Sequence, residues 1–283
     1  MNNIRIIPRL DIKGPNLVKG IHLEGLRVLG KPETFARFYY ENGADELFFQ
    51  DTVASLYDRN SLHEIITKTA KEIFIPLTVG GGLRSIEDIR NVLRAGADKV
   101  AINTAAIKNP NFIREASLKF GSSTIVIAIE AIKDNDGKYL AFMDNGREHT
   151  GLEVVTWARK VEELGAGEIV ISSVDKEGTG EGYDLELIKA VSEAVSIPVI
   201  AHGGASNPEN VVNAILYGKA DAVAIASILH YSVMQSFSNN SSDYKAEGNI
   251  SFLNSGKIPK NIYLSSLKEI RSALIKAQIP TRF

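Results

Sequence analysis

The sequence contains no cysteine among its 283 residues. That absence excludes disulfide bonds, thiolate metal ligands and a cysteine nucleophile, and it leaves the redox environment undetermined. The chain also lacks a strong excess of either charge, because 32 basic residues stand against 34 acidic ones. Domains that bind nucleic acid usually carry a clear basic surplus, so this balance argues against a nucleic-acid partner.

Long hydrophobic runs are missing as well. No stretch approaches the roughly 18 uninterrupted apolar residues that a membrane-spanning helix needs. Residues 1–14 lack the basic segment, apolar run and small-residue cleavage site of a signal peptide. The five histidines form no cluster with the spacing of metal ligands, so we expect no metal and no cofactor. Together these absences predict a cytoplasmic protein without a membrane partner.

The sequence does contain a regular alternation of short apolar runs and longer amphipathic stretches. The apolar runs are rich in β-branched residues and predict strands that are buried on both faces. They cover residues 4–10, 46–50, 75–79, 99–102, 124–129, 168–172, 198–201 and 222–225. The helical patterns between them cover 32–42, 85–95, 111–120, 152–164, 184–194 and 208–217. Eight strands separated by helices are typical of a closed barrel.

An internal repeat favours the barrel over an open sheet. IPLTVGGG at 75–82 is similar to IPVIAHGG at 197–204, and ADKVAINT at 97–104 is similar to ADAVAIAS at 220–227. Two such halves, joined near Gly121, would build a barrel with approximate twofold symmetry. The predicted fold class is therefore α/β, a (β/α)₈ (TIM) barrel with half-barrel duplication.

This barrel is expected to occupy the whole chain, residues 1–283, as one domain. The segment 236–260 breaks the pattern, because it is polar and rich in serine, asparagine and glycine. It is interpreted as a surface insertion before a last helix over 264–277.

Two glycine-rich turns occupy equivalent places in the two halves. Residues 80–82 follow the third predicted strand, and residues 203–204 follow the seventh. Glycine lets backbone N–H groups approach a phosphate that a side chain would hold away. Each turn is joined by a pair of residues after the next strand, Asn103 and Thr104 in the first half and Ala226 and Ser227 in the second. A lone pair of glycines is usually a turn, but two equivalent copies predict a substrate with a phosphate at each end.

Carboxylates also stand at predicted strand ends. Asp11 closes the first strand and Glu130 closes the fifth, which lies opposite in an eight-stranded barrel. Such an opposed pair suits a general acid and a general base that serve separate steps. Asp51, Asp175 and Glu177 follow the second and sixth strands and are candidates for substrate contact, although a single acidic residue at such a position is as often a loop cap.

Two further features carry charge. The segment 13–30, with its four glycines and several basic residues, is interpreted as a lid over a phosphorylated ligand or as an ordinary flexible loop. Four charged residues begin strands at the opposite end of the barrel, where inward charges are costly unless they are paired or functional. A ring of salt bridges that merely plugs the barrel is the alternative. His202 is interpreted as a hydrogen-bonding residue at the rim of the barrel rather than a ligand.

Six motifs resemble the cyclase subunit of imidazole glycerol phosphate synthase over about residues 4–230: RLDIK at 9–13, VKG at 18–20, VGGG at 79–82, AINTAA at 101–106, GAGEI at 165–169 and AHGGA at 201–205. The resemblance implies a duplicated barrel enzyme that pairs with a glutaminase subunit at its N-terminal face. Ammonia made by the partner would pass through the barrel and attack a bisphosphorylated substrate. The products would be imidazole glycerol phosphate, a histidine precursor, and an aminoimidazole carboxamide ribonucleotide.

The resemblance also implies roles for single residues. Asp11 matches a catalytic aspartate, and Glu130 stands at the position of the second. The residues that match the phosphate sites and the lid are Lys19, Gly82, Asn103, Thr104, Gly178, Gly204, Ala226 and Ser227. The residues that match the ammonia gate are Arg5, Glu46, Lys99 and Glu168. Asp98 matches a residue that faces the glutaminase.

Three positions depart from the family pattern. Glu130 and Glu177 replace aspartates, and Arg9 replaces a small residue. The extra methylene of Glu130 moves its carboxylate by roughly 1.5 Å, and a displacement of that order can cost about 100-fold in rate. These changes leave open a paralogue that channels ammonia to a sugar amidotransferase in surface polysaccharide synthesis. Because both carboxylates survive, the sequence favours the cyclase. A sugar-phosphate isomerase, the third alternative, would not explain the gate charges.

Overall fold

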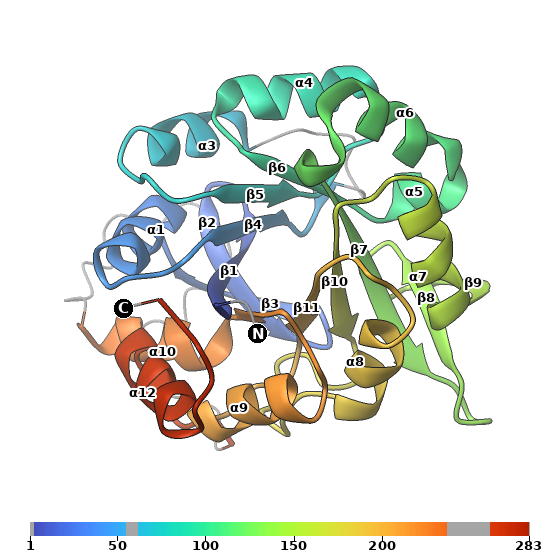
Figure 1. Ribbon diagram of the computed structural model, residues 1–283. Helices are drawn as coiled ribbons and strands as arrows, with labels where there is room; N and C mark the ends of the chain where they lie inside the picture. The colour runs from blue at the N-terminus through green and yellow to red at the C-terminus, as the bar shows by residue number, and fades with distance from the viewer. Residues whose placement is uncertain (1–2, 55–61, 237–260, 283) are drawn as a thin grey trace.

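A ring of eight parallel strands forms the centre of the computed structural model, which describes residues 3–54, 62–236 and 261–282 (Figure 1). Each strand pairs with the next, and pairing of β12 with β1 closes the ring. The strands in ring order are β1 (Arg5–Lys13), β4 (Leu47–Asp51), β5 (Leu77–Gly80), β6 (Lys99–Ile102), β7 (Ile125–Lys133), β10 (Glu168–Ser173), β11 (Val199–His202) and β12 (Ala222–Ile225). The predicted (β/α)₈ barrel is thereby confirmed.

Helices surround this ring (Figure 1). They are α1 (Pro32–Glu41), α3 (His63–Ala70), α4 (Ile86–Ala95), α5 (Thr104–Lys108), α6 (Asn111–Phe120), α7 (Val154–Glu163), α8 (Leu185–Ser192), α9 (Pro208–Leu216), α10 (Ser227–Ser236) and α12 (Leu267–Lys276), with a 3₁₀ turn over Ser122–Thr124. Local signals set several boundaries; Ser85 and Asp88, for example, form a reciprocal capping box at the start of α4. The predicted insertion lies outside the described residues except for Ser236, which ends α10.

The core has two layers because alternate residues of each strand face opposite sides of the barrel wall. Outward-facing side chains such as Ile6 and Leu10 of β1 pack with the helices in one large cluster. Inward-facing side chains form a second apolar cluster around the barrel axis, which contains Ile7, Phe48, Ala101, Val126, Val170, Ile200, Ala222 and Ala224. Burial on both sides explains why the strands are almost continuously apolar in sequence.

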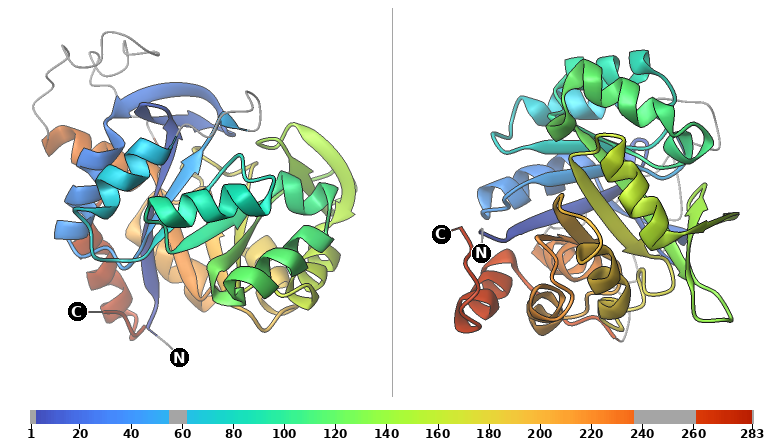
Figure 2. Two further views of the ribbon diagram at one scale, coloured as in Figure 1. Left: turned by 90° about the horizontal axis from the view of Figure 1, so that it is seen from above. Right: turned by 45° about the vertical axis from the view of Figure 1, so that its right-hand side comes forward.

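Each half of the barrel carries an antiparallel hairpin on its first strand. β2 (Asn16–Ile21) and β3 (Glu24–Gly30) extend from β1, and β8 (Tyr139–Met143) and β9 (Glu148–Glu153) extend from β7. Both hairpins lie at the end of the barrel away from the chain termini (Figure 2, left). Two sequence interpretations are refined here: residues 13–30 are a β-hairpin rather than an irregular connection, and the duplication includes a second hairpin that the sequence pattern did not predict.

Candidate functional site in the barrel mouth

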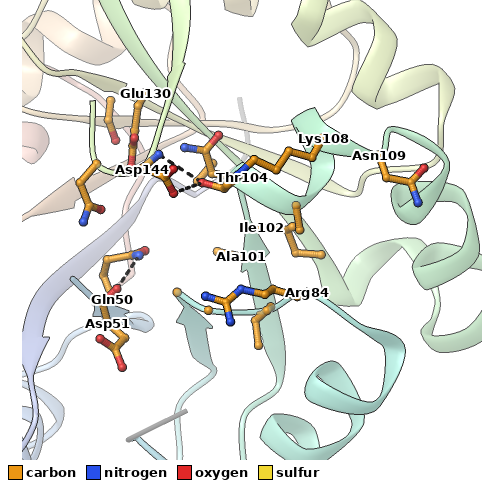
Figure 3. A pocket seen from close by; sticks show the side chains of 18 of the residues that line it. Gln50, Asp51, Arg84, Ala101, Ile102, Thr104, Lys108, Asn109, Glu130 and Asp144 are labelled. Atoms are coloured by element: carbon orange, nitrogen blue, oxygen red, sulfur yellow. Dashed lines mark hydrogen bonds between the residues drawn. The ribbon is translucent and has the colours of Figure 1, made fainter. Parts of the chain in front are cut away.

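The C-terminal ends of the strands form the mouth of the barrel, and a first cavity of about 340 Å³ opens there beside β4, β5, β6 and β7 (Figure 3). Five of the predicted catalytic and substrate-binding residues line it: Asp51, Gly82, Asn103, Thr104 and Glu130. The same cavity is lined by others that sequence reasoning missed, among them Gln50, Arg84, Lys108, Asn109, Asp144, Asn145 and Ser172.

The glycine turn after β5 suits close approach by a ligand. Gly81 has a φ of +102°, a conformation that side chains disfavour. A Cβ atom at Gly81 would also collide with the Asp51 carbonyl oxygen. The cationic residues Arg84 and Lys108 line the same cavity, with Arg84 on the side across from Glu130 (Figure 3). Backbone amides and two cations at one place are the surroundings that an anion prefers.

The second glycine turn lines a much smaller cavity of about 20 Å³. That volume holds about one water molecule and is too small for a phosphate group. Lining it are the four residues that match the second phosphate site, Gly178, Gly204, Ala226 and Ser227, together with the lid residue Lys19 and the candidate contact residue Glu177. The structure thus brings these residues together, but the cavity between them is too small to admit a phosphate group.

The β2–β3 hairpin covers this second cavity. The His22 N–H donates to the Glu177 carbonyl oxygen at 2.9 Å, and the Leu23 N–H donates to Glu177 Oε2 at 3.0 Å. Lys19 reaches the other carboxylate oxygen of Glu177 and forms a buried ion pair with it. Both carboxylate oxygens of Glu177 therefore bind the β2–β3 hairpin, one at Lys19 and the other at the Leu23 amide.

Gly204→Ala tests how closely the backbone must approach at the second cavity. Gly204 has a φ of +99°, and a Cβ atom there would collide with the Gly182 carbonyl oxygen. Gly151 is the matched control, because it also has positive φ, +74°, but a Cβ atom at that position would meet nothing within 4 Å. We expect urea unfolding to show a loss of about 1 kcal/mol for Gly151→Ala and about 2–3 kcal/mol for Gly204→Ala. Equal losses would contradict the close approach.

Asp11 is buried at the centre of the mouth, with 2% of its surface exposed. Arg9 Nε donates to one carboxylate oxygen at 3.1 Å, and Lys19 Nζ donates to the other at 3.2 Å. Asp11 itself lines neither cavity, but Arg9 lines the first and Lys19 the second. Burial alone would raise the pKa of Asp11, yet the attraction of Lys19 and Arg9 outweighs it and holds the pKa well below its usual range.

Glu130 lies on β7, across the mouth from Asp11. Its surroundings raise its pKa, whereas those of Asp11 lower the pKa of Asp11. Burial raises the pKa of Glu130 to about 7, against the opposing effects of the Gly146 N–H and the charge of Arg9. The Gly146 N–H donates to Glu130 Oε2 at 2.8 Å. This amide belongs to the turn between β8 and β9, which Asn145 anchors through a 2.6 Å bond to the Thr52 carbonyl oxygen. Two carboxylates whose pKa values are pushed apart are the arrangement that acid–base catalysis uses.

His202 hydrogen-bonds as expected, although it is buried inside the mouth rather than placed at its rim. Its Nδ1 lies 3.2 Å from Arg9 Nη1 and 3.1 Å from Ser172 Oγ. An arginine can only donate, so Nδ1 must be the acceptor and the ring proton belongs on Nε2. Burial and the nearby Arg9 lower the pKa of His202 well below its usual value, so the ring is neutral. Within the described ranges, no group of three or more His, Asp or Glu residues could hold a metal ion.

At the opposite end of the barrel, four charges form a closed lower ring of alternating sign. Arg5 Nη1 lies 2.7 Å from Glu46 and 2.9 Å from Glu168. Lys99 Nζ lies 3.2 Å from each of the same two carboxylates. The four residues predicted as a gate are therefore in contact with one another, directly below the apolar cluster of the barrel axis.

Several acidic residues named from sequence cap backbone groups. Asp51 Oδ1 accepts from two successive amides, those of Val53 and Ala54, at 3.0 Å each. Asp175 accepts from the Lys133 N–H at 2.9 Å. Asp98 is exposed near the lower ring, where its Oδ2 accepts from the Leu77 N–H at 2.9 Å.

The repeat-equivalent Asp221 caps Val199 in the same way as Asp98 caps Leu77, at the same distance of 2.9 Å. This hydrogen bond gives Asp98 a structural role that does not depend on a partner subunit. A contact between its free oxygen and another subunit stays a prediction.

The fold and the mouth define a (β/α)₈ barrel of duplicated half-barrels, with a glycine-lined cavity beside each half and a buried carboxylate network between them. Residues 5–235 match the model of the histidine biosynthesis protein family. The chain belongs to that family.

Close relatives agree with this assignment. A protein of Legionella pneumophila named imidazole glycerol phosphate synthase subunit HisF is 60% identical over 204 residues, which cover 72% of this chain and 96% of the relative. Proteins of the same name from Methanocaldococcus jannaschii and Alkaliphilus metalliredigens are 50% and 48% identical, each with 80% of this chain and 90% of the relative covered. In the described part of the chain, none of the helices is long and apolar enough to span a membrane.

Proposed function

We propose that this protein is the cyclase subunit of an imidazole glycerol phosphate synthase and serves histidine biosynthesis. It uses ammonia from a glutaminase partner to cleave and cyclise a bisphosphorylated ribulosyl-aminoimidazole nucleotide. The relatives named above support this function. The observation that carries it is the pair of carboxylates, Asp11 and Glu130, held with opposite proton affinities between two glycine-lined cavities.

In this proposal the two carboxylates divide the proton transfers between them. Cleavage of a carbon–nitrogen bond requires a proton for the departing nitrogen, and ring closure by an amine requires that protons be removed. Glu130, whose pKa is raised to about 7, holds its proton below that pH and is the general acid. Asp11 stays ionised and is the general base. The first cavity holds one phosphate of the substrate, and the second opens to hold the other when the β2–β3 hairpin releases Glu177.

Ammonia would enter at the lower ring and travel along the barrel axis. Above the ring, the passage is bordered by apolar side chains such as Ile7, Phe48 and Val126. Such a lining favours neutral ammonia over the ammonium ion, because an unpaired charge there would lose its hydration. The ion pairs among Arg5, Glu46, Lys99 and Glu168 close the lower ring, so at least one of them must break each time an ammonia molecule passes.

The glutaminase would dock at the lower end of the barrel. Phe74 is 81% exposed there, which is unusual for a large aromatic side chain. It lines two shallow cavities, of which one includes Arg5 and the other includes Asp98. An exposed aromatic residue next to charged groups is the composition expected at a protein interface.

The direct test supplies the purified chain with the bisphosphorylated nucleotide and excess ammonium salt at mildly alkaline pH, where free ammonia is present and part of Glu130 is still protonated. We expect imidazole glycerol phosphate to form without any glutaminase. Absence of product, under conditions where calorimetry shows that the nucleotide binds, would contradict the proposed reaction.

Lys99→Ala tests the lower ring. It removes two of the four ion pairs of the ring, so we expect ammonia to escape and glutamine-dependent turnover to fall about 10-fold. Ammonium-dependent turnover should stay within about twofold, because the ring lies at the far end from the mouth. The matched control is Lys189→Ala on α8, where the lysine is exposed. If both activities fall together, the ring supports the fold rather than a passage.

A further inference from the structure

Arg9 occupies an unusual place for an arginine. It lies on β1 between Ile7 and Asp11, faces the barrel axis, and is 5% exposed. A guanidinium group cannot lose its charge in a protein, so its burial is costly unless every contact is provided. The contacts that Arg9 makes therefore indicate what its charge is used for.

The side chain of Arg9 joins the two half-barrels. Nε donates to Asp11 on the same strand, while Nη1 donates to Ser172 Oγ at 3.3 Å on β10 and to His202 Nδ1 at 3.2 Å on β11. Its guanidinium carbon lies 5.4 Å from the ring centre of Phe48 on β4, within range of a cation–π contact. Four strands therefore hold the guanidinium in one orientation.

The backbone of Arg9 is fixed as well. His230 Nε2 donates to the Arg9 carbonyl oxygen at 2.8 Å, and the Tyr39 hydroxyl donates to His230 Nδ1 at 2.6 Å. This buried chain ties α1 and α10 to the middle of β1. Because both the main chain and the side chain are held, Arg9 can set the position of Asp11, two residues further along.

Arg9 also stands between the two carboxylates. Its charge favours the ionised forms of both Asp11 and Glu130, and it lines the first cavity together with Glu130. The other charged or titratable groups facing Asp11 are Lys19, paired in turn with Glu177, and the neutral rings of His202 and His230. The other charged group facing Glu130 is Asp144.

We propose that Arg9 is a positioning residue for the reaction: it spans the barrel axis to hold Asp11 in place, and it supplies positive charge to the acid and the base at once. This inference rests on the proposed function, because it assigns those two roles to Glu130 and Asp11. It predicts that loss of the Arg9 charge changes the pH range of activity as well as its magnitude.

The test compares Arg9→Met and Arg9→Lys in the ammonium-dependent assay. Methionine keeps an unbranched apolar stem but no charge, so both carboxylates bind their protons more tightly. The alkaline limb of the kcat/KM profile, which reports the protonated acid Glu130, should move up by about one pH unit when the rates are referred to free ammonia. We expect kcat to fall about 10- to 100-fold at the wild-type optimum. Arg9→Lys keeps the charge and should leave the alkaline limb in place while kcat falls.

Arg37→Gln is the matched control, because the Arg37 side chain is 62% exposed on α1 and pairs only with surface carboxylates. It should leave both the profile and the rate unchanged. A lower kcat with an unshifted alkaline limb in Arg9→Met would overturn the inference in favour of a merely structural role. A raised KM with kcat and the alkaline limb unchanged would overturn it in favour of substrate binding.

If Arg9→Met does not fold, as judged by circular dichroism, Arg9→Lys alone decides. If the alkaline limb of its kcat/KM profile moves although the charge is kept, the inference is contradicted. An unmoved alkaline limb with a reduced kcat supports it. The failure of the proposed function is a separate outcome, since it would show itself as a wild-type protein that binds the nucleotide but forms no product.

Discussion

Replacing Asp11 with asparagine is expected to reduce ammonium-dependent turnover by about 100- to 10,000-fold. Asparagine nearly preserves the shape but cannot accept a proton at the carboxylate position. The effect should be confined to kcat, because Asp11 lines neither cavity and is expected to contribute little to the binding of the phosphates. The measurement is steady-state kinetics with saturating ammonium salt, together with calorimetry of the bound nucleotide.

The same substitution should also lower stability. Lys19 would keep its ion pair with Glu177, but Arg9 would lose its ion pair with Asp11 while its charge stays buried. Removing one partner from such a buried network typically costs about 3–5 kcal/mol, which urea unfolding can measure. Asp136→Asn, in an exposed turn, is the matched control and should change neither property. An Asp11→Asn protein with wild-type turnover would remove Asp11 from the mechanism.

Replacing Glu130 with glutamine is expected to lower turnover by about 100-fold or more, because the amide cannot donate the proton that the acid supplies. The pH dependence follows from the raised pKa of about 7. Glu130 is protonated and competent below that pH, so wild-type kcat/KM should decline as the pH rises through it. In the glutamine variant the residual activity should lose this decline. Glu148→Gln, on the exposed face of β9, is the matched control.

Glu130→Asp probes the length of the side chain. The shorter carboxylate would withdraw from the Gly146 amide, which it now meets at 2.8 Å. We expect turnover to fall about 10- to 100-fold, since a misplacement of about 1 Å has effects of that size. A gain in turnover would mean instead that Glu130 is an impaired acid and that the β8–β9 turn does not serve it.

The strands and the duplication could be predicted from sequence because their signals are local. The apolar run at 75–79 and its copy at 197–201 each record burial on both faces of one strand. The β8–β9 hairpin escaped notice because β9 is largely exposed and carries polar residues instead of an alternating pattern. Its turn supplies the Gly146 amide to Glu130, so a missed surface element proved to be part of the site.

The positions of the two glycine-lined cavities could be predicted from the sequence, but the closed form of the second could not. Glycines at the ends of β5 and β11 mark where backbone can approach an anion, and that mark is visible in sequence. The sequence did not predict that Lys19 and Glu177 would meet and close the second cavity, because they stand 158 residues apart. Arg84 and Lys108 were missed for a related reason: Arg84 lies in the loop before α4 and Lys108 ends the short helix α5, so neither falls in a pattern that marks a basic residue as part of a site.

By itself the sequence determined the barrel, the equivalence of its halves and the strand ends at which Asp11 and Glu130 stand, since these follow from periodicity along the chain. Only the tertiary structure decided which carboxylate keeps its proton. Proton affinity depends on burial and on charges within a few ångströms. For Asp11 and Glu130 those surroundings come from β1, β2, β11 and the β8–β9 turn, which the closed barrel brings together.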